Sequence, residues 1–369
     1  MPQQQKHKKK LIFAVTNDLN YDQRMIRICK SLHNGGHNVL LVGRKLKTSL
    51  PLTRQDFRQK RLFCFFTRGK LFYIEYNIRL FFFLLFQKMD LVCAIDLDTI
   101  LPCYFVSILR NKKRVYDAHE LFCEMKEIVT RPAIYKIWKA IEKFTVPRFK
   151  YGYTVNEPIQ QILKNDYNVD YGVIMNVPFL KPLNDVKKER FIIYQGAVNE
   201  GRSFETLIPA FQWIDCPLWI FGTGNYFEQC KRLIEENQLR DKVILKGKVL
   251  PNDLSSITPR AVMGITLFEN KGLSNYYSLG NRFFDYVQAG IPQLCVNYPV
   301  YQKINDQFEV SVLIDDLSPS SLAVAINRLL NDEVLQKKLQ KNCLLAREVF
   351  NWQNEEKKLL NFYHQIFTD

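Results

Sequence analysis

Short apolar segments alternate with helical patterns along the whole chain, and this alternation constrains the fold more than any other feature. Each segment holds two to five apolar residues, and the stretches between them repeat apolar residues at helical spacing. Such alternation is typical of βαβ units, which build parallel sheets. Strands are predicted at residues 11–15, 39–42, 91–95 and 114–116, and in a second series at 191–194, 218–221, 243–245, 263–267 and 293–296. The pattern predicts an α/β protein with two doubly wound domains.

The domain boundary is predicted between the two series of strands. Residues 181–190 (KPLNDVKKER) are polar and charged and contain one Pro, as expected of a linker. We therefore predict an N-terminal domain over 1–183 and a C-terminal domain over 184–351. The last helical stretch breaks near residues 351 and 352, and the final segment, 352–369, is expected to return to the first domain.

Charge and composition narrow the classes of partner. The chain has 369 residues, 47% of them hydrophobic, which is enough for about two domain cores. It carries 52 Lys and Arg against 37 Asp and Glu, a net charge of +15 that favours an anionic partner. Nucleic acid, an anionic membrane face and a phosphorylated substrate all fit this charge. The 15 Gly and 15 Pro follow no period, which excludes collagen and repeat arrays.

The cysteines and the lengths of the apolar runs indicate in which cellular compartment the protein is expected. The nine cysteines include no C-x-x-C pair, so we expect buried, reduced thiols in a cytoplasmic protein, not a zinc cluster or redox motif. The apolar run at 11–15 is too short for an export signal, and the run at 80–86 is far below the roughly 20 residues of a membrane span. The expected location is the cytoplasm, with peripheral attachment to the inner membrane face as a further expectation.

The strongest local motif is LGNRFFDYVQAGIP at residues 279–292. It predicts a helix opened by Asn281, Arg282 and Asp285 and ended by Gly290. Free N–H groups and the charge of Arg282 favour an anion at the start of this helix, and Asp285 can accept hydrogen bonds from ribose hydroxyls. The alternative is an ordinary capped amphipathic helix.

Two further turns after predicted strands have the character of ligand loops. One runs from Gly196 to Arg202, and the other contains Gly222-Thr223-Gly224. Glycines let a backbone approach a ligand closely, and a cation at a helix start suits a diphosphate. These two turns and the start of the helix within residues 279–292 come together only if the second sheet is parallel.

The first domain offers two candidate groups at strand ends. His119 and Glu120 follow the strand at 114–116, and the first loop is rich in hydrogen-bonding side chains at Asn17, Tyr21, Asp22 and Arg24. The alternatives are a structural histidine and a capped loop in which Asp22 is the N-cap of the next helix.

Residues 54–88 interleave eight basic with eleven Phe and Tyr residues. Basic and aromatic residues together suit a membrane interface or stacked bases. Alternatively, the Phe-rich half is a buried helix and the charges are a solvated edge.

Taken in order, the motifs resemble those of retaining glycosyltransferases of the GT-B fold, family 4 in particular. The resemblance covers NDLNYDQRMIRICKSLHNGGHNVLLVGR, VYDAHELFCE, YQGAVNEGRSFETLI, LWIFGTGNYFEQ, VILKGKV and GNRFFDYVQAGIP, the last of which is similar to the family's N-K-x-F-E-Y-x-A-G-x-P helix. It implies two Rossmann-like domains facing a central cleft, with the acceptor on the first and a nucleotide-diphosphate sugar on the second.

The resemblance also implies roles for individual residues. Arg202 and Arg282 would bind the diphosphate, Asp285 the ribose, and His119 the donor sugar near the scissile bond. The remaining donor contacts would come from Gly196, Gly222, Gly224, Lys248, Val249 and Asn281, while Asn17, Tyr21, Asp22, Arg24 and Glu120 would line the acceptor or the diphosphate. Two positions depart from the family: Ala197 stands where many members have Arg, and Tyr277 where the first Glu of the E-x7-E pattern falls.

By the same resemblance, the anomeric configuration is retained without a protein nucleophile, and the leaving phosphate takes the acceptor proton. No D-x-D motif stands in a place suited to a metal, so we expect no metal requirement and no tightly bound cofactor, with basic residues in the metal's place. The expected function is transfer to a glycan or lipid-linked acceptor in cell-surface polysaccharide synthesis. A non-catalytic nucleic-acid- or membrane-binding protein and a nucleotide-sugar epimerase are the alternatives, although no nucleic acid is expected because no recognition motif accompanies the charge.

Overall fold

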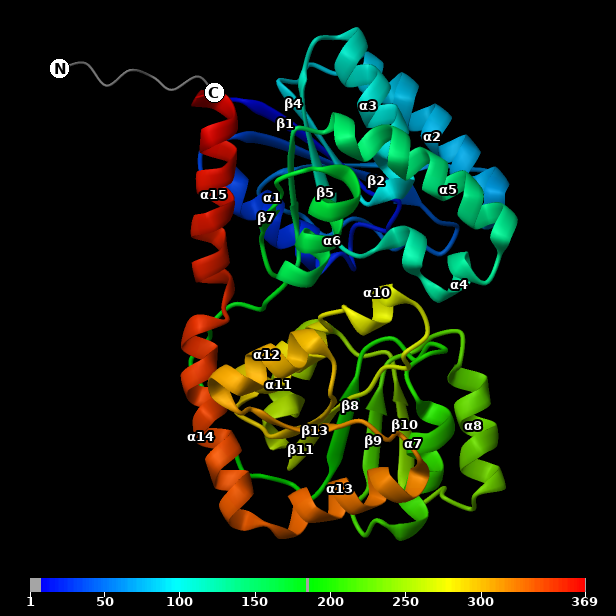
Figure 1. Cartoon of the computed structure of the whole chain (residues 1–369), viewed down its shortest axis with the longest axis vertical. Coiled ribbons are helices and arrows are strands. Elements are labelled where there is room, and N and C mark those ends of the chain that lie inside the picture. The colour runs from blue at the N-terminus through cyan, green and yellow to red at the C-terminus, as the bar shows by residue number, and fades with distance from the viewer. Residues whose placement is uncertain (1–7, 184–185, 369) are drawn as a thin grey trace, which may run out of the picture. The chain divides into compact units, whose positions relative to one another are not determined.

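A computed structural model describes residues 8–183 and 186–368 of the chain and divides it into two compact units (Figure 1). Unit 1 comprises Met1–Met175 and Glu355–Asp369, and unit 2 comprises Asn176–Asn354. The predicted boundary between 183 and 184 meets residues 184 and 185, which lie outside the described residues.

Unit 1 is built on a seven-stranded parallel sheet in the order β3-β2-β1-β4-β5-β6-β7. Its strands are β1 (Lys10–Ala14), β2 (Asn38–Lys45), β3 (Arg58–Phe63), β4 (Leu91–Ile95), β5 (Lys113–Ala118), β6 (Tyr151–Thr154) and β7 (Gly172–Val173). The helices between them are α1 (Gln23–Asn34), α2 (Gly69–Leu85), α3 (Ile100–Leu109), α4 (Lys126–Val129), α5 (Pro132–Thr145) and α6 (Glu157–Tyr167).

The last helix, α15 (Trp352–Thr368), completes the core of unit 1 with the residues after Asn354. Leu359, Tyr363 and Ile366 are fully buried, and the Tyr363 ring lies 6.0 Å from that of Phe13 on β1. Lys113 of β5 donates a hydrogen bond to the carbonyl of Ile366. The C-terminal residues are therefore an integral part of unit 1 although they are distant in sequence.

Unit 2 has a six-stranded parallel sheet in the order β10-β9-β8-β11-β12-β13. Its strands are β8 (Ile192–Gln195), β9 (Leu218–Phe221), β10 (Val243–Gly247), β11 (Met263–Thr266), β12 (Gln293–Val296) and β13 (Ser311–Ile314). Its helices are α7 (Phe204–Ala210), α8 (Phe227–Glu236), α9 (Pro251–Ile257), α10 (Leu273–Tyr276), α11 (Asn281–Ala289), α12 (Pro299–Phe308), α13 (Pro319–Asn331) and α14 (Glu333–Val349).

All nine predicted strands are present, and both sheets are parallel in every pairing, which confirms the doubly wound α/β prediction. Four strands were not predicted: β3, β6, β7 and β13. All nine cysteines are buried and free, as expected. Within the described residues, no helix combines the length and the apolar character that crossing a membrane requires.

Candidate functional site

Polar groups gather where the parallel strands end in each unit, as is general for ligand sites on open α/β sheets. The arginine cluster of unit 2 consists of Arg202, Arg282 and the rings of Tyr194 and Phe268. The His119 cluster of unit 1 consists of Arg24, Asp96, Asp98, Asp117 and His119.

Arg282 is a buried cation at the start of α11. Its guanidinium carbon lies 4.1 Å from the ring centroid of Tyr194 and 5.3 Å from that of Phe268, and the residue is only 7% exposed. Its Nη1 atom has no hydrogen-bond partner among the described residues. Because a buried charge without hydrogen bonds is costly, this atom is suited to receive an anion. Helix α11 begins after Gly280 without a side-chain N-cap. Its first backbone N–H groups therefore point towards the end of the helix at which Nη1 of Arg282 is suited to receive an anion.

Arg202 brings a second cation to the same ring. Its guanidinium carbon lies 4.4 Å from the ring centroid of Phe268, so both arginines of the cluster contact one buried phenyl group. The loop that carries Arg202 is fixed to the end of β11, because the Glu269 N–H donates to the Gly201 carbonyl at 3.0 Å. The cluster thus combines residues of β8 and α11 with residues of the segments that follow β8 and β11.

The glycines of the two loops are required by backbone packing. Gly222 has φ +148°, and a Cβ there would lie 1.8 Å from the carbonyl oxygen of Gly196. A Cβ on Gly224 would lie 2.2 Å from the carbonyl oxygen of Val198. Gly196 itself, at φ +120°, leaves room beside the Arg282 guanidinium, whose Nη2 would be 3.8 Å from a Cβ. The loops after β8 and β9 therefore pack backbone to backbone next to the arginine cluster.

Asp285 is positioned by a residue that sequence reasoning missed. The Gln195 side chain donates from Nε2 to Oδ2 of Asp285 at 2.8 Å and accepts at Oε1 from the Thr258 hydroxyl at 2.6 Å. Gln195 is buried and is the last residue of β8. A polar residue at the end of an otherwise apolar strand is the sequence feature from which its role could have been predicted. The carboxylate of Asp285 is thus held one helical turn beyond Arg282.

The other candidates of unit 2 lie around this core. Asn281 is exposed and accepts a hydrogen bond from the Asn176 amide at 2.6 Å. Lys248 is exposed after β10, whereas Val249 packs against a hydrophobic core cluster. Tyr277 ends α10 and its ring lies 5.0 Å from that of Tyr276.

In unit 1, both ring nitrogens of His119 face carboxylates. Nε2 lies 3.0 Å from Oδ2 of Asp117, and Nδ1 lies 3.6 Å from Oδ2 of Asp96. The His119 backbone N–H also donates to Oδ1 of Asp96 at 2.8 Å. The remaining oxygen of Asp117 pairs with Nη2 of Arg24 at 3.0 Å. The imidazole is therefore fixed between two carboxylates at the ends of β4 and β5.

Burial and charge set the protonation states of this cluster. Burial alone would lower the pKa of His119, but Asp117 and Asp96 raise this pKa to about 9. Burial raises the pKa of Asp96 to about 8 and that of Asp98 to about 7. Against burial, Arg24 and His119 hold the pKa of Asp117 below its usual range. Asp117 and Asp96 therefore favour the protonated form of the His119 ring.

The first loop has the capping role that was the alternative prediction. The Asp22 side chain accepts from the Met25 N–H at 3.0 Å as the N-cap of α1, and from the Asn17 amide at 2.9 Å. Arg24 is buried, and its Nη1 donates to the carbonyl of Ile174 at 3.0 Å, so its guanidinium serves the interior of unit 1.

Two predicted site residues of unit 1 are more accessible than the others: Tyr21 is 44% exposed and Glu120 is half-buried.

Two residues of the His119 cluster were not predicted from the sequence. These are Asp96 and Asp98, although Asp-Leu-Asp directly follows the apolar strand at 91–95. Asp96 adopts a left-handed backbone conformation, φ +55°, which is rare for a residue other than Gly, Asn or Asp. Asp98 accepts from the Thr16 hydroxyl at 2.6 Å.

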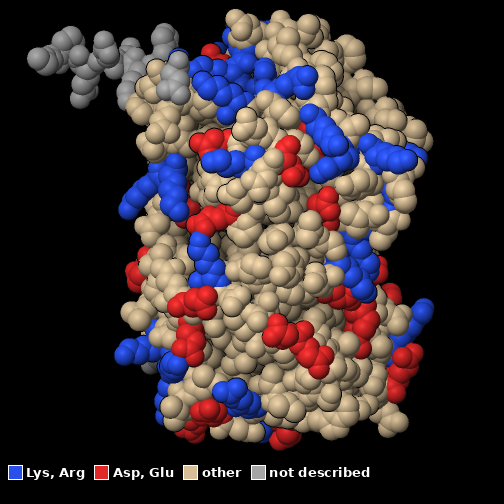
Figure 2. Space-filling view, in the orientation of Figure 1, with Lys and Arg blue, Asp and Glu red and all other residues tan. Residues whose placement is uncertain are grey.

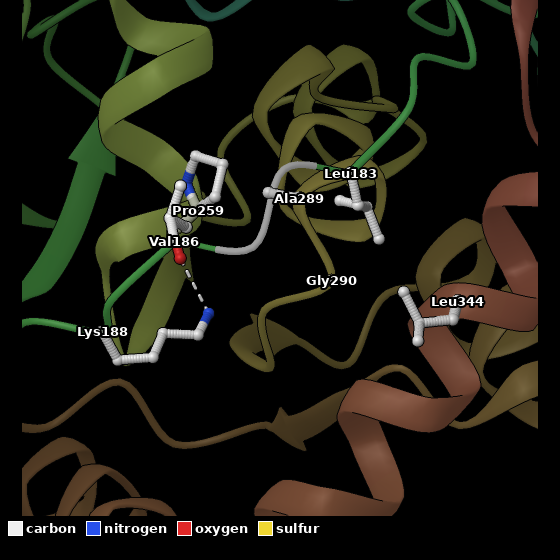
Figure 3. A pocket seen from close by; sticks show the side chains of 7 residues that line it. All are labelled: Leu183, Val186, Lys188, Pro259, Ala289, Gly290 and Leu344. Carbon is white, nitrogen blue, oxygen red and sulfur yellow. Dashed lines mark hydrogen bonds between the residues drawn. The ribbon is translucent and has the colours of Figure 1, made fainter.

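Outside these clusters, the described residues form no metal site, and the cavity of unit 2 lies apart from the predicted site residues. Within residues 8–183 and 186–368, no three His, Cys, Asp or Glu side chains are placed to hold a metal ion. A cavity of about 330 Å³ lies at the opposite end of α11, beside Ala289, Gly290 and Leu344, where Lys188 donates to the Pro259 carbonyl (Figure 3). That cavity contains none of the predicted site residues.

Comparison with known proteins identifies the second unit and the fold. Residues 179–344 match the family model of glycosyl transferases group 1. No curated protein sequence matches the chain significantly. The sucrose-phosphate synthase of Thermosynechococcus elongatus is similar in structure, with a TM-score of 0.80, 16% identity, and coverage of 98% of this chain and 100% of that chain.

Two further solved structures share this architecture. Anabaena HepE in complex with UDP-glucose has a TM-score of 0.75 and 12% identity, covering 97% of this chain and 100% of that chain. The apo form of the lipopolysaccharide outer core galactosyltransferase WaaB has a TM-score of 0.64 and 14% identity, covering 96% and 99%. At these identities the likeness establishes the fold alone. Residues 179–344, a little under half of the chain, are thus similar to the glycosyl transferases group 1 family, and the chain has the GT-B fold.

Proposed function

We propose that the protein transfers a sugar, with retention of anomeric configuration, from a nucleoside-diphosphate sugar to a glycan or lipid-linked acceptor in cell-surface polysaccharide synthesis. One observation carries the donor assignment: Arg282 is buried with an unpartnered Nη1 beside a second arginine and two glycine loops. A diphosphate supplies the negative charge and the oxygen acceptors that this arrangement lacks.

The donor would lie along the ends of β8, β9 and β10. Arg202 and Arg282 bind the diphosphate, the flat backbone of Gly196, Gly222 and Gly224 gives it room, and Asp285 accepts hydrogen bonds from the ribose. Lys248 and Val249, after β10, lie next to the base. Asn281 adds its side chain at the start of α11, where the free N–H groups stabilise negative charge.

In the reaction, the bond between the anomeric carbon and the diphosphate oxygen breaks, and a bond to the acceptor hydroxyl forms on the same face. The leaving phosphate oxygen takes the acceptor proton, and Arg202 and Arg282 stabilise its growing charge. Because Arg282 is already desolvated and held by two rings, little reorganisation accompanies this step.

His119 acts in this proposal as a fixed positive charge. Its ring nitrogens lie 3.0 Å from Asp117 and 3.6 Å from Asp96, and these carboxylates favour the protonated ring, which has no lone pair with which to accept a proton. This state supports a mechanism in which the acceptor proton goes to the leaving phosphate, without a histidine base. Glu120 and the first loop, with Asn17, Tyr21 and Asp22, remain the proposed lining of the acceptor side.

The solved structures named above support the substrate class. HepE was captured with UDP-glucose, and WaaB is a galactosyltransferase of the lipopolysaccharide outer core. For this chain, we therefore propose a uridine diphosphate sugar as the first donor to test and a cell-surface glycan as the acceptor class.

The test is a thermal-unfolding screen of the full chain with UDP, GDP, ADP and CMP, with and without Mg²⁺. At 100 times its dissociation constant, a ligand of the folded state adds about 2.7 kcal/mol of stability. We expect one nucleotide to raise Tm, equally with and without Mg²⁺. No shift with any nucleotide, while UDP-sugar consumption is also absent, would contradict the donor assignment.

Retention is tested separately by proton NMR of the product after reaction with that nucleotide's glucose or galactose conjugate. The anomeric coupling of the new linkage should match that of the donor. Inversion would contradict the retaining mechanism but leave the donor site intact, and a changed sugar without acceptor would point to epimerisation.

A further inference from the structure

Helix α2 is apolar on two opposite faces. Phe72, Tyr76, Leu80 and Leu84 are buried against the sheet, at a spacing of four residues. On the other side, a stripe of five side chains is 52–78% exposed: Leu71, Ile74, Ile78, Phe82 and Phe86. A water-facing helix surface is normally polar, so an apolar stripe about 22 Å long requires an explanation.

Neighbouring elements enlarge this apolar surface. Phe65 and Phe66, both exposed, are tied to α2 because their N–H groups donate to the Glu75 carboxylate at 3.0 and 2.9 Å. Helix α3 packs against α2 and α5, and these three helices lie side by side on unit 1 (Figure 1). They add further exposed apolar residues: Phe105, Ile108 and Leu109 on α3, and Ile137 and Phe144 on α5. We call the exposed apolar residues of α2, α3, α5 and 65–66 the apolar face.

Positive charges outnumber negative ones on the helices of the apolar face. The three helices contain only two carboxylates, and both are neutralised: Glu75 pairs with Arg79 at 2.8 Å, and Glu142 with Lys139 at 2.7 Å. Exposed lysines stand on or next to α2 and α5, at positions 70, 88, 136 and 143. In the view of Figure 2, the part of unit 1 with α3 and α5 shows uncharged surface interspersed with Lys and Arg side chains, with a few Asp and Glu side chains nearby.

The sequence places almost all of the net charge in this unit. Unit 1 contains 32 Lys and Arg against 18 Asp and Glu, a net charge of +14, whereas unit 2 contains 20 against 19, a net charge of +1. An apolar surface bordered by cations matches a bilayer face, where acyl chains lie below anionic headgroups.

From this geometry and charge we infer that the apolar face docks unit 1 onto a lipid surface rich in anionic headgroups. The exposed stripe of α2 enters the headgroup region, and Lys70, Lys88, Lys136 and Lys143 contact the headgroup phosphates. The inference is independent of the proposed sugar transfer, because it involves no residue of the arginine or His119 clusters.

The experiment is sedimentation of the full chain with vesicles of phosphatidylcholine alone or with 30% phosphatidylglycerol. The test variant is Ile74→Gln with Ile78→Gln, and the matched control is Val324→Gln with Val334→Gln on unit 2, where both residues are at least 70% exposed. Gln suits a helix and these side chains are exposed, so both variants should unfold as the wild-type protein does.

We expect binding to the anionic vesicles only, with a partition coefficient at least tenfold lower in the Ile74→Gln, Ile78→Gln variant and unchanged in the control. Lys70→Glu should lower binding by fivefold or more, since each basic residue near an anionic surface contributes about fivefold. Absence of binding, or equal binding by all variants, would overturn the inference. So would a dimer in lipid-free solution that the Ile74→Gln, Ile78→Gln variant converts to monomer, because the apolar face would then be a contact between copies.

Discussion

Replacing Arg282 by Met should separate stability from nucleotide binding. Without ligand, the change removes two cation–ring contacts, at 4.1 and 5.3 Å, each of which contributes about 0.5–2 kcal/mol. It also removes a buried guanidinium whose unpartnered Nη1 costs about 1–3 kcal/mol. The two effects nearly cancel, so the free energy of unfolding should change by less than about 1 kcal/mol, which corresponds to a Tm change of about 4 °C or less.

The loss of nucleotide binding by Arg282→Met should be large in comparison. A charge-assisted hydrogen bond to phosphate contributes about 1.5–3 kcal/mol, so the dissociation constant of the best nucleotide should rise about 10–150-fold. Calorimetric titration measures this rise, and Arg232→Met on α8 is the control, because Arg232 is an exposed arginine of the same unit. Arg282→Lys should bind with intermediate affinity, since it keeps the charge but not the planar fork.

One pair of results would refute this reasoning. If Arg282→Met lowered Tm by about 10 °C or more while the nucleotide affinity stayed unchanged, Arg282 would be a structural residue whose role is to support Phe268 and Tyr194. The donor assignment would then rest on the wrong part of α11.

Three further predictions concern neighbouring groups. Gly222→Ala should destabilise the protein by about 3 kcal/mol or more in urea unfolding, because a Cβ would overlap a facing carbonyl, whereas Gly247→Ala, in open space at φ +70°, should cost only about 1 kcal/mol. Since the pKa of His119 is raised to about 9 from 6.5, its stabilisation is complete below pH 6.5 and lost as the pH rises through 9; unfolding free energies should fall by about 3 kcal/mol over this range, and His119→Gln should flatten the fall. Gln195→Ala should weaken nucleotide binding about fivefold by releasing Asp285, with little change if Asp285 does not contact the ligand.

The strands that could be predicted from the sequence are those in which burial produces a local pattern of apolar residues. β4 and β8 are buried at every residue; β4 is an unbroken apolar run, and β8 is apolar up to its last residue, Gln195. β3 is an edge strand with the sequence RQKRLF, half of it exposed, and β7 has only two residues. Such strands are held by pairing with a neighbour, which leaves little trace in their own side chains.

The same limit applies to the site. Glycine turns and Arg282 were found because each is a local motif. The contacts that position them join distant residues: Gln195 to Asp285 across 90 positions, and Arg24 to Asp117 across 93. Only the sheet order, which brings strand ends together, relates these positions. Arg24 is an example. It was predicted to line the acceptor or the diphosphate, whereas in the structure it is buried in an ion pair with Asp117.

The two units also differ in how they use positive charge, and salt should distinguish the two uses. Unit 2 is almost neutral, so its selection of an anion depends on Arg282, which is buried and therefore weakly screened. Unit 1 carries its charge on exposed lysines, whose attraction to a surface is screened as the Debye length falls from about 10 Å at 0.1 M towards 3 Å at 1 M. Raising NaCl from 0.05 to 0.5 M should therefore lower vesicle binding at least tenfold while the nucleotide dissociation constant changes less than about threefold. Equal sensitivity of both equilibria would mean that the nucleotide is held by the diffuse surface charge, and would contradict the assignment of the buried arginine as its anchor.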